Sequence, residues 1–255
     1  MTYLDNLQPL VDKLPPITID EMKSIRLMKR TDTKFVTNLD KLAELLKMAD
    51  GHYYAQRVND IAFSPYATTY FDDPVRSMFQ THQRNARPRV KVRVRTYING
   101  GDTFLEIKKK DNHGRTHKKR IKVESLETVL QEREGEKFLQ KHTDLTFDQI
   151  QPTVSNRFHR ITLVNFEKTE RLTIDFGLRF INNETGGEEE FADAVVIELK
   201  RDGRVPSPIL PLLRKLRIHP SGFSKYCVGA VMTESATRVN RFKKKIRRIH
   251  KSVAR

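Results

Sequence analysis

The segment Arg89-Val90-Lys91-Val92-Arg93-Val94-Arg95 decides how this sequence folds. Successive side chains of a β-strand point to opposite faces, so this segment places four cations on one face and three valines on the other. For one strand alone, the ordinary explanation is an apolar face on the core and a charged face in water. The pattern becomes informative because other segments repeat it.

Five further segments show the same alternation, and carboxylates occupy some of their polar positions. The polar residues are Arg30, Asp32 and Lys34; Glu106, Lys108 and Lys110; Lys118, Arg120 and Lys122; Arg171, Thr173 and Asp175; and Glu198 and Lys200. Asn99-Gly100-Gly101 is a strong hairpin signal between the Arg89 segment and the Glu106 segment. These two segments are therefore expected to pair as antiparallel neighbours.

Two folds would satisfy such strands. In the first, the charges face water and the apolar faces form a sandwich core, which is the usual situation for charged strand residues. In the second, the sheet closes into an antiparallel β-barrel with the charges inside and helices packed outside. The expected helices span 40–48, 124–142 and 208–217. They follow a lead-in over 1–28, which is irregular at first and then contains a short amphipathic piece from Thr18 to Met28. We favour this α+β barrel, because like charges on neighbouring strands repel one another unless an anion lies between them.

The composition restricts the class of partner. The chain of 255 residues carries a net charge of +16, which favours nucleic acid, anionic lipid or a phosphate-rich substrate. RNA recognition usually adds aromatic side chains for base stacking, and the alternating strands carry few, so nucleic acid is disfavoured. The single cysteine, Cys227, fits a reducing compartment. No signal peptide or apolar window of about 18 residues is present, so a soluble, cytoplasmic protein is expected.

A lumen lined with this many cations needs an anion, because unpaired charges are costly to desolvate. A polyphosphate ligand supplies that anion. Carboxylates among the cations are suited to a divalent metal that bridges phosphates.

These residues resemble the triphosphate tunnel metalloenzymes and, within them, the catalytic domain of the vacuolar transporter chaperone (VTC) family, the polyphosphate polymerases. The opening Glu-x-Glu-x-Lys strand of the superfamily corresponds to Arg30-Thr31-Asp32-Thr33-Lys34, which lacks the first Glu and has Asp for the second. The further motifs occur in the family's order: Arg93-Val94-Arg95-Thr96-Tyr97, Glu106-Ile107-Lys108, Lys118-Lys119-Arg120, Ser155-Asn156-Arg157, Arg171 to Asp175, Glu198-Leu199-Lys200 and Ser224-Lys225-Tyr226. The resemblance covers about residues 28–230.

The resemblance implies a tunnel that transfers the γ-phosphate of ATP to a growing polyphosphate chain with Mn²⁺ or Mg²⁺. By position, the residues expected to hold phosphates are Lys34, Arg93, Arg95, Lys108, Lys118, Arg157, Arg171 and Lys225. Glu198 would be the main metal ligand, supported by Asp32, Glu106 and Asp175. A tripolyphosphatase or nucleoside triphosphatase of the same fold, and a non-catalytic polyphosphate- or RNA-binding module, remain as alternatives.

The C-terminal tail differs from the rest of the chain. Residues 238–255 contain nine Lys or Arg and no acid, so we divide the chain into a tunnel domain with its lead-in, 1–237, and a basic amphipathic helix, 238–255. Val239, Phe242, Ile246, Ile249 and Val253 form one apolar stripe, which is expected to pack on the barrel. Contact of the tail with an anionic membrane surface, a separate membrane protein or emerging polyphosphate stays open, and would make the protein peripheral to a membrane.

Overall fold

The computed structural model describes residues 3–23, 25, 30–203, 205–233 and 240–254. Eight strands form one antiparallel path in the order β2-β11-β9-β8-β4-β5-β6-β7. In that order their bounds are Arg30–Thr37, Val195–Asp202, Glu170–Asn182, Gln151–Asn165, Ser64–Asp72, Arg89–Tyr97, Asp102–Lys110 and Thr116–Val123. Three short strands flank the path: β1 (Pro16–Ile17) pairs with β3 (Tyr53–Gln56), β3 pairs with β8, and β10 (Glu188–Phe191) pairs with β9.

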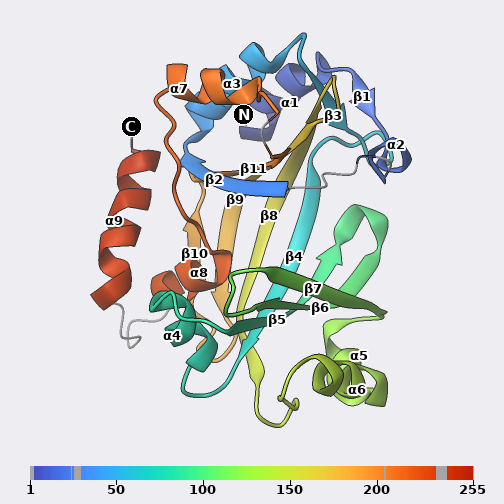
Figure 1. The fold of residues 1–255 in the computed structure, drawn as a ribbon, viewed down its shortest axis with the longest axis vertical. Helices are drawn as coiled ribbons and strands as arrows, with labels where there is room; N and C mark the ends of the chain where they lie inside the picture. Colours follow the sequence, from blue (N-terminus) through green and yellow to red (C-terminus); the bar gives the residue numbers. More distant parts are fainter. Residues whose placement is uncertain (1–2, 24, 26–29, 204, 234–239, 255) are drawn as a thin grey trace.

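The path curls into a half-barrel, with β5, β6 and β7 crossing the direction of the long strands β8 and β9 (Figure 1). Strands β2 and β7 end the path, and within the described part of the chain no pairing joins them. The predicted α+β antiparallel fold is therefore confirmed, with a curled open sheet in place of a fully closed barrel.

The register places the alternating charges on one face of the sheet, which we call the inner face. Residues directly opposite each other on paired strands point to the same side. The paired inner residues include Lys34 with Glu198, Glu198 with Thr173, Arg160 with Asp175, Arg93 with Glu106, and Lys108 with Lys118. The predicted charged faces thus lie on a common surface.

Helices cover the aliphatic outer face in two groups. Helices α1 (Tyr3–Asp12), α3 (Leu39–Ala49) and α7 (Ile209–Lys215) bury a core that includes Leu172, Ile174 and Ile197. Helices α5 (Leu126–Gln131) and α6 (Arg133–His142) cover Val92 and Leu105 at the other end of the sheet. The irregular start of the lead-in was a wrong prediction, because residues 3–12 form α1. The amphipathic piece predicted from Thr18 contains the short helix α2 (Ile19–Lys23).

The single helix predicted over 124–142 is two helices. Glu132 between them has an extended backbone, with φ −86° and ψ 133°. The turn brings the start of α6 against the end of α5, and a Cβ on Gly135 would lie 2.7 Å from the Val129 carbonyl oxygen. Gly135 therefore serves the close packing of the two helices.

A third core lies on the inner face and was not predicted. Helix α8 (Lys225–Thr233) packs on the inner side of β8 and β9, next to α4 (Ser77–Gln83) and α9 (Asn240–Val253). Its apolar partners on the strands include Val154, Phe158 and Phe180. The half-barrel is thus filled at one end by α8, and the charged side chains occupy the remainder of the inner face.

The basic tail packs on the body through its apolar stripe, as predicted. Phe242 and Ile249 are buried, and Ile246 and Val253 are partly buried against the same core. Val239 and the boundary proposed between 237 and 238 lie outside the described residues. No described helix is long and apolar enough to cross a membrane.

Candidate phosphate-binding site

Cations from seven strands and one helix converge on the inner face. We call this set the cationic face: Lys34, Lys91, Arg93, Arg95, Lys108, Lys118, Arg160, Arg171, Lys200 and Lys225. Among the carboxylates of this face, Glu106, Asp175 and Glu198 each contact two of the cations.

Glu106 holds the first pair of cations. Its carboxylate accepts from Arg93 Nε at 2.8 Å and forms an ion pair with Lys118, while its side chain is only 1% exposed. Burial raises the pKa of Glu106, but Arg93, Arg95 and Lys118 outweigh this effect and lower the pKa to about 2. Glu106 is therefore an anion at neutral pH and fixes the Arg93 guanidinium from one side.

Asp175 holds the second pair. Arg160 donates two hydrogen bonds to its carboxylate, from Nε at 2.6 Å and from Nη2 at 2.8 Å, and Lys225 donates to Oδ2. Such a two-point contact fixes the guanidinium plane as well as its position. Despite burial, Arg160 and Lys225 hold the pKa of Asp175 well below its usual range.

Two cations of the face, one buried and one partly buried, have no carboxylate partner in the described part of the chain. Arg95 is 7% exposed and donates from Nε to the Thr68 hydroxyl at 3.1 Å. Lys91 donates from Nζ to the Ser224 hydroxyl at 3.0 Å, and burial together with nearby lysines lowers its pKa to about 8. Buried cations held only by neutral oxygens favour the binding of an anion.

Glu198 is held more loosely than the other two carboxylates. Its oxygens lie 3.8 Å from Lys34 Nζ and 3.2 Å from Lys200 Nζ, and its side chain is 21% exposed. Burial raises the pKa of Glu198, and Lys34 and Lys200 outweigh it, bringing the pKa to about 2. The carboxylate is thus ionised and accessible.

These carboxylates can bind a metal ion only together with phosphate oxygens and water. The described residues contain no group of three or more His, Cys, Asp or Glu side chains that could enclose a metal. Mg²⁺ bound with phosphates usually takes one or two protein carboxylates and completes its shell with phosphate oxygens and water. Glu198 fits that role, whereas Glu106 and Asp175 are each occupied by two cations at close range. Asp32 is exposed at the β2 edge, opposite Lys200.

The first turn of α8 is anchored to the strands beside the site. Tyr226 donates to the buried carboxylate of Asp72, which also accepts from the backbone nitrogens of Met78 and Phe79 at 2.9 Å each. The ring of Tyr226 stacks on Tyr70 of the inner face. This anchoring fixes Lys225, one residue earlier, over the ring of Phe158 at 4.2 Å.

The structure brings together seven of the eight predicted phosphate-binding residues. They are Lys34, Arg93, Arg95, Lys108, Lys118, Arg171 and Lys225. Arg157 is not among them: it pairs with Ala67 and Arg179 on the outer face and is exposed. The arginine that β8 contributes is Arg160. Arg160 lies two residues after Phe158 and four after Asn156, and both of these are buried on the inner face. This alternation is the signal that could have identified Arg160.

The sequence matches a known family over most of its length. The family model of the VTC domain matches residues 29–233. The chain belongs to the VTC-domain family. No curated protein matches the sequence at a significant level.

Two solved structures were found to be similar to this VTC domain. A candidate adenylyl cyclase from Hippeastrum with a dominant triphosphatase activity is 14% identical, with a TM-score of 0.51 over 82% of this chain and 98% of its own. A candidate adenylate cyclase from Bacillus halodurans is 10% identical, with a TM-score of 0.48 over 84% of this chain and 99% of its own. At this level of identity the Hippeastrum protein shows a shared triphosphate-tunnel fold, and the fold alone.

Proposed function

We propose that this VTC domain is an ATP-dependent polyphosphate polymerase, which transfers the γ-phosphate of ATP to the end of a growing polyphosphate chain. The observation that carries the proposal is the excess of buried cations over carboxylates on the inner face. Arg95 and Lys91 have no acidic partner among the described residues, while Arg93 and Arg160 are already fixed by one. Such a surface suits a ligand with several adjacent negative charges.

The chemistry requires little covalent work by the protein. Phosphoryl transfer depends on in-line positioning and on neutralising charge on the equatorial oxygens. The guanidinium groups of Arg93, Arg95 and Arg160 suit two-point contacts with non-bridging oxygens, and the lysines act as point charges. A terminal phosphate of the acceptor chain is already ionised, so no general base is needed.

A divalent cation, Mn²⁺ or Mg²⁺, would enter with the ATP phosphates and be held by Glu198, with Asp32 as a supporting group. When bound, it supplies further charge neutralisation on the phosphates. Glu106 and Asp175, predicted as metal ligands, are better suited to orient Arg93 and Arg160, because each is enclosed by cations.

A triphosphatase is the second candidate. The same cationic face would hydrolyse a triphosphate if water took the place of the acceptor phosphate, and the structural neighbour from Hippeastrum has a dominant triphosphatase activity. A non-catalytic polyphosphate-binding module is the third.

One experiment separates the three. Purified protein is incubated with ATP and Mn²⁺, and long polyphosphate is resolved from orthophosphate. Long chains that a polyphosphate-specific phosphatase digests support the polymerase. Orthophosphate alone supports the hydrolase, and tight polyphosphate binding without turnover supports the binding module.

A further inference from the structure

Three lysines from separate elements converge on the short segment that leads into α8. Lys34 of β2 donates from Nζ to the Phe223 carbonyl at 3.1 Å, and Lys91 of β5 donates to the Ser224 hydroxyl at 3.0 Å. Lys245 of α9 reaches the same segment: its Nζ lies 3.3 Å from the place that a Cβ would take on Gly222. The segment is itself fixed to the edge of β2, because Ser221 N donates to the Lys34 carbonyl at 2.7 Å.

This end of the inner face lacks acidic partners. Within the described residues, no ion pair connects Arg89, Lys91 or Lys245 to a carboxylate, and Arg89 donates to the Asn85 side-chain oxygen at 3.1 Å. His82 of α4 lies among them, with Nδ1 buried and without a hydrogen-bond partner. Burial lowers the pKa of His82, and Lys91, Arg89 and Lys245 lower it further, to about 2. The cations and the neutral imidazole leave an electropositive site to which the described residues contribute no anion.

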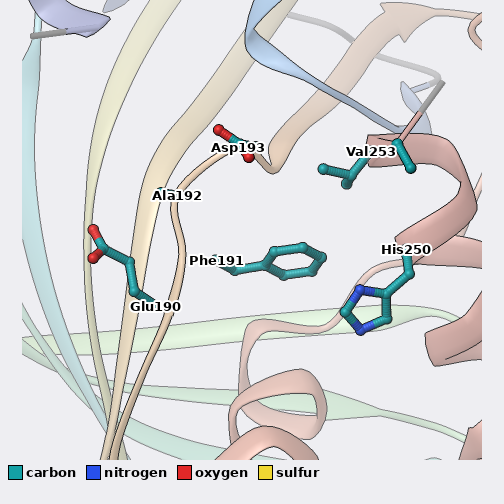
Figure 2. A pocket seen from close by; sticks show the side chains of 7 residues that line it. Glu190, Phe191, Ala192, Asp193, His250 and Val253 are labelled. Carbon is teal, nitrogen blue, oxygen red and sulfur yellow. The ribbon is translucent and has the colours of Figure 1, made fainter.

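Helix α9 holds Lys245 in place, although it follows the residues that match the VTC family. Phe242 is 3% exposed and Ile249 is fully buried, and the Asn38 side chain donates to the Val253 carbonyl at 2.9 Å. At the far end of the helix, the His250 ring lies against Phe191, with 5.1 Å between the ring centres (Figure 2). The hollow beside them is lined by residues 190–193, 250, 253 and 254 and contains no member of the cationic face.

The side chain of Lys245 is ordered by packing. Its ammonium group lies 5.0 Å from the centre of the Phe242 ring. Burial lowers the pKa of Lys245, and the nearby charges of Lys34 and Arg89 lower it further. Its neighbour Lys244 is exposed to solvent on the same helix. The two lysines therefore differ in environment while sharing charge and position in the sequence.

We propose that Lys245 of α9, together with Arg89 and Lys91 of β5, forms an outer subsite at one end of the cationic face, which binds phosphate units of a linear polyphosphate beyond those at the reacting centre. The choice of polyphosphate as ligand depends on the proposed function. Arg89 lies four residues from Arg93 on β5, about 13 Å along an extended strand, which is farther than a triphosphate spans. The outer subsite would therefore discriminate long chains from triphosphate.

The test compares Lys245→Gln with Lys244→Gln, each of which removes one positive charge. Affinities for tripolyphosphate and for long-chain polyphosphate are measured by calorimetry, without ATP or metal. In Lys245→Gln, we expect affinity for the long chain to fall about tenfold more than affinity for tripolyphosphate, because a partly buried charged contact is lost. In Lys244→Gln, the two affinities should change together, by roughly twofold or less.

Equal losses for both ligands in Lys245→Gln, or the same selective loss in Lys244→Gln, would overturn the outer subsite. Lys245→Met keeps the aliphatic stem over Phe242 and should show the same selectivity, which separates loss of charge from loss of packing. Because the readout is binding, it is independent of turnover. If the wild-type protein makes no polyphosphate but Lys245→Gln still selectively loses affinity for the long chain, the polymerase is refuted and the subsite is retained.

Discussion

Two regions of the inner face contain similar numbers of cations but differ in whether these cations are paired with carboxylates. In the paired centre, formed by Arg93, Glu106 and Lys118 with Arg160, Asp175 and Lys225, every cation contacts a buried carboxylate. In the outer subsite, Arg89 and Lys91 donate to neutral side-chain oxygens, and Lys245 lies over the ring of Phe242.

The difference separates two requirements of phosphate chemistry. A reacting phosphate needs donors that are already oriented before it binds, and buried carboxylates provide this by fixing the guanidinium planes. A chain that must move through the site needs attraction without fixed orientation, which lysines supply as point charges. Four predictions test this division, ordered from the largest expected effect to the smallest.

Removing the negative charge of Asp175 should damage the paired centre most. Asp175→Asn leaves Arg160 and Lys225 buried without a counter-ion, which should lower the free energy of unfolding by about 3–5 kcal/mol. Urea denaturation of the ligand-free protein measures the loss. Added tripolyphosphate should recover part of it, because a ligand that binds only the folded state stabilises that state.

The matched control is Glu190→Gln, which breaks the pair with Arg179 at 3.7 Å on the exposed surface. Its unfolding free energy should stay near the wild-type value. An Asp175→Asn protein as stable as that control would mean that the carboxylates are dispensable for holding the centre.

Glu198 lies between the two kinds of environment, since it is ionised but loosely paired. Glu198→Gln should reduce metal-dependent turnover at least about hundredfold, because the accessible carboxylate for a phosphate-bound metal is lost. The fold should be retained, as measured by the thermal unfolding midpoint. Full activity in this variant would sink the assignment of Glu198 as the metal ligand.

Strand parity made much of this arrangement predictable from sequence. Arg93, Glu106, Asp175 and Glu198 share a face because alternation fixes the side of each residue once a strand is recognised. Arg157 shows the limit of motif matching. It is next to Phe158, which points to the inner face, so strand alternation predicts that Arg157 points outward, and the structure puts it on the outer face. The motif predicted an inner-face arginine at 157, whereas β8 places Arg160 on that face.

The rest depended on tertiary packing that local patterns do not encode. Helix α8 fills one end of the inner face, so Val154 and Phe158 are apolar on the same side as Arg160. Likewise, the nine basic residues of the tail look equivalent in sequence. Only the docking of α9 directs Lys245, and not Lys244, toward Gly222.

The lysines should make anion binding depend on pH. Burial lowers the pKa of Lys91 and of Lys225 to about 8, so both lose charge as the pH rises through that value in the free protein. A bound polyanion raises these pKa values, and binding above about pH 8 should therefore take up protons. Tripolyphosphate affinity should fall roughly tenfold per pH unit for each lysine that it contacts.

Calorimetry in buffers of different ionisation enthalpy measures the proton uptake directly. Lys225→Arg keeps its charge across this range and should show a shallower decline of affinity with pH. An affinity that is constant between neutral pH and the ordinary pKa of lysine would contradict the lowered pKa of these two side chains in the free protein.

The smallest signal comes from Tyr70, whose hydroxyl lies 3.3 Å from Arg93 Nη1. Burial raises the pKa of Tyr70, but Arg93, Arg95, Lys91 and Lys225 outweigh it and lower the pKa to about 7. In the free protein, part of Tyr70 should therefore be ionised at neutral pH. A triphosphate beside it disfavours the phenolate, so binding should decrease tyrosinate absorbance in the near ultraviolet, and Tyr70→Phe should abolish the change.

This signal also separates the two regions, because Tyr70 contacts the paired centre through Arg93. Tripolyphosphate should produce the same absorbance change in Lys245→Gln as in the wild type, although long-chain affinity is selectively reduced there. Burial raises the pKa of Tyr53, Tyr66 and Tyr226, which keeps these three tyrosines protonated at neutral pH. An absorbance change that depends on Lys245 would mean that the paired centre and the outer subsite respond to the ligand as one unit. The two regions would then differ only in whether their cations are paired with carboxylates.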